Sequence, residues 1–343
     1  MSARARLSAA IEQLLLLDGD DARLKAAALE LRALLDELTA FDGEHPDNRG
    51  DSVLPSGIAL AALDAAACVT DWPRTSTFMA GTVAAVHAAR ARFPDRRIEV
   101  VYAGCGPFAL LVLPLAVRFT AAEVGFTLVD VHTRSLELAR TLFAALDIED
   151  YVIDRVHADA TTYVHPRPHG FHVLVSETMR NGLASEPQVA ITLNLAGQLA
   201  PGGFLVPERI TIGAYLDDLD ERELFLTGDL SPAPERGRRA GITELGTIFE
   251  LHAHTPPPVD GAFPNVTVCV PDGTPRYLVL STRIETFRGI HLDDYASGLT
   301  YPSVLRTLGR VAAGSVLDIR YVPGQEPGFR YTLAHPHPDS VTA

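Results

Sequence analysis

The chain has 343 residues, enough for one large or two medium domains with a substantial hydrophobic core. Its 47% hydrophobic and 21% charged residues are typical of a globular protein and argue against a disordered one. Acidic residues number 43 and Lys plus Arg 29, so the formal net charge of −14 argues against nucleic acid as a partner and favours a cationic substrate.

The cysteines and the apolar runs exclude further classes of protein. No two of the three cysteines form a CxxC pair, so we expect neither a structural zinc site nor a disulfide framework. No apolar run approaches the ~20 residues that a membrane-spanning helix needs. The leucines at 14–17 are too few for the apolar segment of a signal peptide. The sequence therefore predicts a cytoplasmic protein without a membrane segment.

The first part of the chain is predicted to be helical. Residues 3–40 are rich in Ala, Leu and Glu, with apolar residues spaced near 3.6, and Asp18-Gly19-Asp20 interrupts them. This pattern predicts a helical hairpin. Residues 41–57 are rich in Gly, Pro and Asp and are predicted to be a loop or linker. A second helical region then runs to about residue 93.

From residue 98, strand-like apolar runs such as IEVVYAG, GFTLVDV and VLVSE alternate with helical patterns. The alternation predicts βαβ units and a parallel sheet with ligands at the C-terminal ends of its strands. After Pro201-Gly202-Gly203 helices become scarce. The later runs predict the antiparallel strands of a second, β-rich unit: FLVPERITIGAYL, TIFELHA, NVTVCVP, RYLVLSTRIETF and SVLDIRYV.

A glycine turn follows the first of these strands. Gly104 and Gly106 in VVYAGCGPFAL lie between a strand and a predicted helix, where small residues let a ligand approach the backbone. The third glycine of a dinucleotide fingerprint is absent, so NAD is not expected. Cys105, inside the turn, is interpreted as a small packed residue and not as a nucleophile.

Two acids end the next strands. Asp130, at the end of FTLVD, is placed to accept hydrogen bonds from two ribose hydroxyls, and Asp159 in VHADATTY is placed to meet an adenine amino group. Each acid alone is more often a turn residue or a helix cap. The turn and both acids together predict a nucleoside-binding edge, whose expected residues are Ala103, Gly104, Cys105, Gly106, Asp130, Val131, Asp159 and Ala160.

The order of these features resembles the class I methyltransferases that use S-adenosylmethionine, and three motifs narrow the resemblance to the protein arginine methyltransferases. SETMRNGLASE, residues 176–186, looks like that family's double-glutamate loop, with Glu177 and Glu186 at its two positions. LAPGGFLVPERIT, 199–211, is similar to the segment that leads into the family's β-barrel. DWPRTSTF, 71–78, is similar to a helix whose arginine, here Arg74, contacts the methionine carboxylate of the cofactor.

Other positions depart from the family. Its tyrosine-rich N-terminal motif is not visible before Asp71, and its Thr-His-Trp loop is absent, with YASGLTYP, 295–302, as the best positional counterpart. Arg180 stands where the family usually has a small residue. These departures concern substrate recognition more than methyl transfer.

The resemblance implies an α/β fold: a Rossmann-like methyltransferase sheet followed by a β-barrel-like domain, with an N-terminal helical extension. We expect three parts, an N-terminal helical hairpin and linker (1–56), a cofactor-binding domain (57–206) and a β-rich substrate and dimerisation domain (207–343). It also implies a homodimer through an arm from the barrel. Residues 217–239, with Leu224, Phe225 and Leu226 among charges, are best placed to supply that arm, although a surface loop is the alternative.

The paired carboxylates suit a guanidinium, which is planar, cationic and matched to carboxylates by its fork of N–H donors. Glu177 and Glu186 would hold two nitrogens of the guanidinium, and the third nitrogen would face the sulfonium methyl. Positioning and electrostatics would then supply the catalysis. The alternative is that Glu177 caps a turn and Glu186 caps the helix that follows. No metal is needed, and the histidines between 157 and 172 give no convincing ligand face.

The acceptor is predicted to be free L-arginine, because the altered motifs are those that shape a peptide groove. Arg180 would pair with the α-carboxylate, and Met179 and Tyr301 would complete the substrate pocket. Arg180 is equally well interpreted as a solvent-facing residue or a partner of a glutamate. The chain is thereby similar to free-arginine methyltransferases of bacterial natural-product pathways, such as that of streptozotocin. The alternatives are an arginine-containing peptide, another small amine or hydroxyl acceptor, and a non-catalytic module that docks through residues 1–40.

Overall fold

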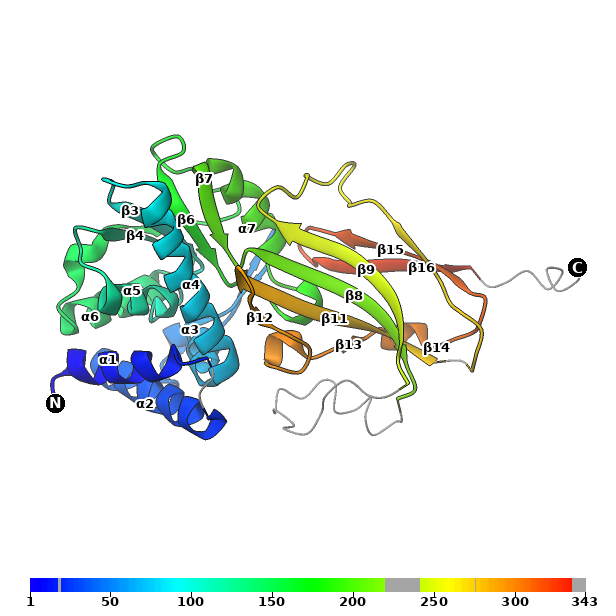
Figure 1. Cartoon of the computed structure of the whole chain (residues 1–343), viewed down its shortest axis with the longest axis horizontal. Coiled ribbons are helices and arrows are strands. Elements are labelled where there is room, and N and C mark those ends of the chain that lie inside the picture. Colours follow the sequence, from blue (N-terminus) through cyan, green and yellow to red (C-terminus); the bar gives the residue numbers. More distant parts are fainter. Residues whose placement is uncertain (18–19, 220–240, 275, 335–343) are drawn as a thin grey trace, which may run out of the picture.

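The structure is a computed structural model and describes residues 1–17, 20–219, 241–274 and 276–334. Figure 1 shows an elongated molecule, with helices and a parallel sheet in one half and long antiparallel strands in the other. This is the predicted fold class.

The N-terminal residues form the predicted helical hairpin, α1 (Ala3–Leu14) and α2 (Asp21–Thr39). Ser2 and Asp20 begin the two helices as N-caps, each accepting a backbone hydrogen bond. The apolar face of each helix is buried in the same hydrophobic cluster as the parallel sheet. The hairpin is therefore part of the main core.

The predicted linker holds regular structure that the sequence analysis missed. After a 3₁₀ turn at Pro46–Asn48, β1 (Ser52–Leu54) and β2 (Gly57–Ala59) form an antiparallel hairpin. The loop prediction is wrong there, because Pro55-Ser56 makes the turn and apolar residues flank it. The expected helical region follows as α3 (Ala62–Ala67), a 3₁₀ turn η2 (Cys68–Thr70) and α4 (Trp72–Arg92).

A five-stranded sheet in the order β5-β4-β3-β6-β7 has every neighbouring pair parallel. Its central strands are buried along their length, as apolar strands covered on both faces should be. The strands are β3 (Ile98–Ala103), β4 (Val124–Asp130), β5 (Val152–His157), β6 (Phe171–Ser176) and β7 (Leu199–Val206). The helices between them are α5 (Leu113–Arg118), α6 (Thr133–Ala145) and α7 (Gln188–Leu195).

One expectation about the end of this sheet is wrong: Phe204, Leu205 and Val206 were expected in the antiparallel unit, but they belong to β7 and pair in parallel with β6. Pro201-Gly202-Gly203 lies in an irregularity of β7 between two paired stretches, where Gly202 has a φ of +83°. The run FLVPERITIGAYL therefore contains two strands. Pro207 between them has no N–H to donate to a neighbouring strand, and the antiparallel unit begins at β8 (Arg209–Asp217). Pro201 is tolerated because β7 is an edge strand.

The second unit consists of two antiparallel sheets, confirming the β-rich prediction. One has the order β12-β11-β8-β9, with β13 and β14 also on β11, and the other has the order β10-β15-β16. Stacked and edge-to-face rings of Phe249, Phe263, Tyr321 and Phe329 pack in its core. The strands after β8 are β9 (Thr243–His252), β10 (Val266–Cys269), β11 (Arg276–Phe287), β12 (Ile290–Leu292), β13 (Ser303–Val304), β14 (Arg310–Val311), β15 (Val316–Val322) and β16 (Gly328–Ala334).

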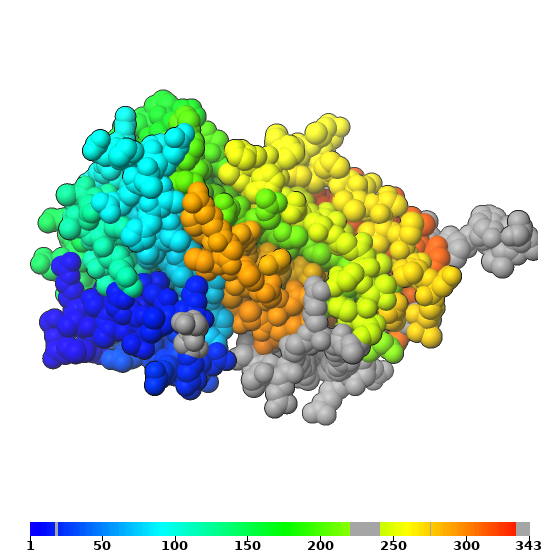
Figure 2. Space-filling model, viewed as in Figure 1, coloured from blue at the N-terminus to red at the C-terminus, as the bar shows by residue number. Residues whose placement is uncertain are grey.

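Helix α4 joins the two units. It contacts β7 of the parallel sheet and both β11 and β12 of the antiparallel unit, and Figure 2 shows the orange strands directly against the cyan helix. The Thr286 hydroxyl donates to the Thr77 carbonyl oxygen at 3.1 Å. Gly81 allows this approach, since an added Cβ there would lie 2.4 Å from Thr286 Oγ1. One continuous core therefore spans both units.

Candidate active site

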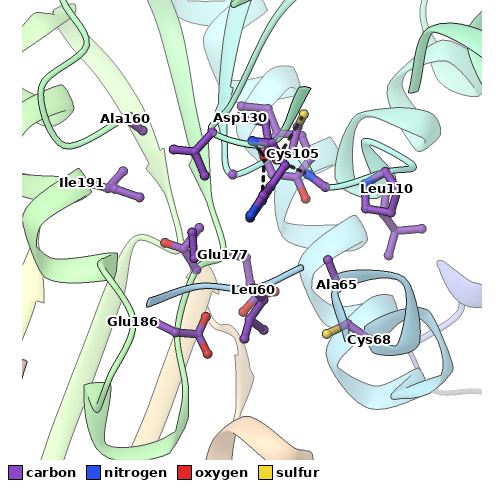
Figure 3. A pocket seen from close by; sticks show the side chains of 18 of the residues that line it. Leu60, Ala65, Cys68, Cys105, Leu110, Asp130, Ala160, Glu177, Glu186 and Ile191 are labelled. Atoms are coloured by element: carbon purple, nitrogen blue, oxygen red, sulfur yellow. Dashed lines mark hydrogen bonds and ion pairs between the residues drawn. The ribbon is translucent and has the colours of Figure 1, made fainter. Parts of the chain in front are cut away.

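A cavity that is partly open to solvent lies at the C-terminal ends of β3, β4 and β6. Figure 3 shows Glu177 and Glu186 near each other along one side, with Ala65 and Cys68 on the other. The structure brings together ten of the predicted site residues in its wall: Arg74, Gly104, Cys105, Gly106, Asp130, Val131, Asp159, Ala160, Glu177 and Glu186.

The glycine turn has the backbone that only glycine adopts easily. Gly104 and Gly106 have φ values of +67° and +63°. An added Cβ at Gly104 would also lie 2.3 Å from Thr178 Cγ2. The helix expected directly after the turn begins only at Leu113, behind a 3₁₀ turn at Leu110–Val112. The turn therefore offers the cavity its backbone and not a helix N-terminus.

Both strand-end acids are held by local hydrogen bonds. Asp130 is buried, and its two oxygens accept from the backbone N–H of Gly106 at 2.9 Å and of His132 at 2.8 Å. Asp159 accepts from the Thr161 N–H at 2.8 Å and its hydroxyl at 2.7 Å, so it is also the turn residue that was the alternative interpretation. The cofactor edge is thus a preorganised set of acceptors.

Glu177 forms an ion pair with Arg74, whose helix is capped by Asp71. The Glu177 side chain is only 8% exposed. Burial raises the pKa of Glu177, and the Arg74 guanidinium partly opposes that rise. Its Oε2 meets Arg74, whereas its Oε1 is buried without a hydrogen-bond partner among the described residues. A buried acceptor oxygen without a partner is rare and indicates a ligand position.

Glu186 is buried beside it. Burial raises the pKa of Glu186 to about 8, and the nearby Glu177 charge adds to the rise while Arg74 and Arg180 oppose it. The helix cap considered for Glu186 is absent, since α7 has Pro187 at its N-cap and no side-chain cap bond. An arriving cation beside Glu186 would favour the charged form of that carboxyl.

Four predicted residues do not line the cavity. Ala103 is buried at the end of β3, and Met179 is buried in the hydrophobic core. Arg180 is exposed on the loop, although its charge reaches Glu186. Tyr301 accepts a hydrogen bond from the Asn181 amide at its backbone oxygen, 3.0 Å away, and its ring packs edge-on to Tyr295.

Sequence reasoning missed another part of the wall. Leu54 and Ile58 of the β1–β2 hairpin line the cavity, as do Leu60 directly after it, Cys68 and His132. The signal available was Pro55-Ser56-Gly57 between short apolar runs, a turn pattern for a hairpin. Nothing in the sequence indicated which loop this hairpin would cover.

Two features are not seen in the part of the chain that the structure describes. No group of three or more His, Cys, Asp or Glu side chains there is arranged to hold a metal ion. No helix in the same residues is long and apolar enough to cross a membrane.

The fold has a counterpart among solved structures. Neither a protein-family model nor a curated protein sequence matches the chain. A chain of the Trypanosoma brucei PRMT1 enzyme–prozyme heterotetrameric complex with AdoHcy is similar, with a TM-score of 0.56 and 13% sequence identity. The match covers 80% of this chain and 93% of that one. The two chains therefore share a fold, a parallel sheet followed by an antiparallel β unit.

Proposed function

We propose that this protein is an S-adenosylmethionine-dependent N-methyltransferase that acts on a guanidino nitrogen, with free L-arginine as the acceptor. The observation that supports it best is the pair of buried carboxylates, Glu177 and Glu186, in one cavity with a nucleoside-type edge. Two such carboxylates with one unpartnered oxygen are suited to a cation with several N–H donors.

The cavity fits the proposed cofactor. Asp130 would accept from the ribose hydroxyls, the open backbone at Gly104 and Gly106 would allow close approach, and Asp159 with Ala160 would meet the adenine. Arg74 would hold the methionine carboxylate on the same side as Glu177. The cofactor supplies an electrophilic methyl group on a sulfonium. That the similar solved structure contains AdoHcy, the demethylated form, agrees with this assignment.

The two glutamates would do different work on the acceptor. Glu177, already fixed by Arg74, presents its free Oε1 to one guanidinium N–H group. Glu186, with its raised pKa, ionises when the guanidinium arrives and accepts from another N–H. Both negative charges stabilise positive charge on the nitrogens they contact. The remaining nitrogen would thereby be oriented for attack on the methyl carbon, so that an N–C bond forms while the S–C bond breaks and leaves its electron pair on sulfur as S-adenosylhomocysteine. The methylated nitrogen would then release one proton to solvent.

Free arginine needs a basic group at the opposite end of the site. Arg180 is exposed, and its charge opposes the rise in the pKa of Glu186. We propose that it pairs with the α-carboxylate. Arg180→Ala should then raise KM for L-arginine roughly 10- to 100-fold, the value of a lost charge-assisted hydrogen bond. Agmatine, which lacks the carboxylate, should lose much less, because only the effect of Arg180 on the charge of Glu186 remains.

The test is a panel of acceptors with labelled cofactor: L-arginine, agmatine and an arginine-rich peptide. Transfer to L-arginine is expected, with exposed Arg140→Ala on α6 as the control variant. Equal losses for L-arginine and agmatine in Arg180→Ala would show that Arg180 only orders the loop. Transfer to the peptide alone would identify a protein arginine methyltransferase. Transfer to none of the three would show that the enzyme uses a different acceptor. Absence of cofactor binding by calorimetry would indicate a non-catalytic module.

We also propose that two copies pair. Asp217 ends β8, and residues 220–239 of the expected arm lie outside the described residues. The similar solved structure belongs to a heterotetrameric complex, which agrees with association. Light scattering at micromolar concentration should give twice the chain mass, and a monomeric mass would contradict the proposal.

A further inference from the structure

The β1–β2 hairpin covers the cofactor cavity and is held on the loops that follow two strands. Ser52 Oγ and His132 Nε2, after β4, are 3.0 Å apart. Ser56 Oγ donates to Thr161 Oγ1, after β5, at 3.4 Å. The side chain of Leu54, at the end of β1, lines the cavity between these contacts.

The hairpin also lies on the backbone of the glutamate loop. The Ile58 N–H donates to the Ser185 carbonyl oxygen at 2.7 Å. Gly57 has a φ of +134°, and an added Cβ would be 2.7 Å from Ser185 O, 3.1 Å from Glu186 C and 3.2 Å from Pro187 N. Such distances leave no room for a side chain, so the hairpin and the Glu186 backbone are in direct contact.

Glu186 has little else to fix it. Its carboxylate accepts no hydrogen bond within the described residues, whereas Glu177 is held by Arg74. From these contacts we propose that Gly57 and Ile58 are positioning residues for Glu186, so that the second glutamate is correctly placed only when the hairpin is closed over the cofactor. The inference rests on the proposed function, in which Glu186 binds the acceptor.

The charge around Glu186 gives this proposal a separate signature. The charged or titratable groups that face it are Glu177, Arg74, Arg180, Asp51 and Cys68. Burial is the largest cause of its raised pKa, and Asp51, next to β1, adds to the rise. Opening the hairpin would admit water to Glu186 and move Asp51 away. Both changes lower the pKa of that carboxyl.

The experiment compares Gly57→Ala with Gly50→Ala. Both glycines have positive φ, +134° and +93°, but nothing lies within 4 Å of a Cβ added at Gly50. The two variants therefore share backbone strain and differ in the clash with residues 185–187. Gly57→Ala should raise KM for the acceptor about tenfold or more, the change that ~1.4 kcal/mol produces. Gly50→Ala should match the unmodified enzyme.

The pH profile of kcat/KM distinguishes positioning from general damage. In the unmodified enzyme it should rise with pH and level off above a pKa of about 8, because the acceptor needs ionised Glu186. In Gly57→Ala that pKa should move lower. The proposal is wrong if Gly57→Ala matches Gly50→Ala, or if its activity falls while the pH profile stays in place.

Hydrogen exchange on the unmodified protein tests the same coupling without a variant. S-adenosylhomocysteine should slow exchange in peptides covering 52–60 and 183–188 together. Protection of the hairpin alone would overturn the coupling and leave the proposed function intact. Absence of any protection or calorimetric binding would instead refute the proposed function, so the two failures are distinguishable.

Discussion

The cofactor end and the acceptor end of the cavity differ in how far their acidic side chains are already hydrogen-bonded. Asp130, at the end of β4, already accepts from the Gly106 and His132 N–H groups, and Asp159, after β5, already accepts from the Thr161 N–H. Glu177 and Glu186 are buried with raised pKa values, and one Glu177 oxygen has no hydrogen-bond partner in the described part of the chain. The first end is complete before any ligand binds, whereas the second is stabilised only when a cation arrives. The acceptor end should therefore be the more sensitive to charge, and the cofactor end to geometry.

The largest expected effect is at the acceptor end. Glu177→Gln keeps the shape but removes a charge, so turnover should fall roughly 10- to 100-fold, the value of a charge-assisted hydrogen bond. Cofactor affinity by calorimetry should stay within about threefold of its original value. Glu137→Gln, at an exposed position of α6, is the matched control. Turnover that survives within threefold would refute the double-glutamate mechanism.

The next effect is at the cofactor end. Asp130→Ala removes the acceptor for two ribose hydroxyls and should weaken cofactor binding by up to about 30-fold, since two hydrogen bonds of ~1 kcal/mol net each amount to ~2 kcal/mol. It also leaves the Gly106 and His132 N–H groups without their partner, at a cost of ~1–3 kcal/mol each in the free energy of unfolding. Asp130→Asn, which keeps one oxygen, should lose less of both. An unchanged calorimetric affinity in Asp130→Ala would rule out the ribose assignment.

A separate effect is a pH dependence of stability. The pKa of Glu186 is about 8 in the folded chain and near its ordinary value of ~4.3 when unfolded. Between those two pH values the folded chain holds a proton that the unfolded chain has released. The free energy of unfolding of the ligand-free protein should therefore fall as pH rises through this window.

Urea unfolding between pH 5 and pH 8.5 measures that slope, and Glu186→Gln should flatten it. The raised pKa of Glu177 acts in the same direction, so a residual slope is expected in the variant. A stability that rises with pH across the window, or an identical slope in both proteins, would mean that Glu186 is ionised in the free enzyme.

Features with a local sequence signal could be predicted. The glycine turn, Asp130 and the two glutamates follow buried strands, and parallel topology places strand ends at one edge. Residues whose role depends on tertiary contacts could not be predicted from the sequence. The hairpin at 52–59 is short and rich in turn residues, so its pattern resembles a linker. Met179 lies next to the site in sequence but points into the core, because the backbone direction of a loop is set by packing.

The run after Pro201-Gly202-Gly203 was assigned to the wrong unit for a related reason. The apolar pattern of Phe204, Leu205 and Val206 fits a strand of either unit, and only the pairing with β6 places these residues in the parallel sheet.

Helix α4 has a consequence for how much of this chain can exist alone. Most of its residues are buried, and it is shared between the parallel sheet and strands β11 and β12. Asp71 at its start also accepts from the Gly298 N–H at 3.0 Å, on the far unit. A fragment that ended at Val206 would expose the apolar flank of the helix that holds Arg74. The cofactor-binding half is therefore not expected to fold independently, and both halves should unfold in one cooperative transition.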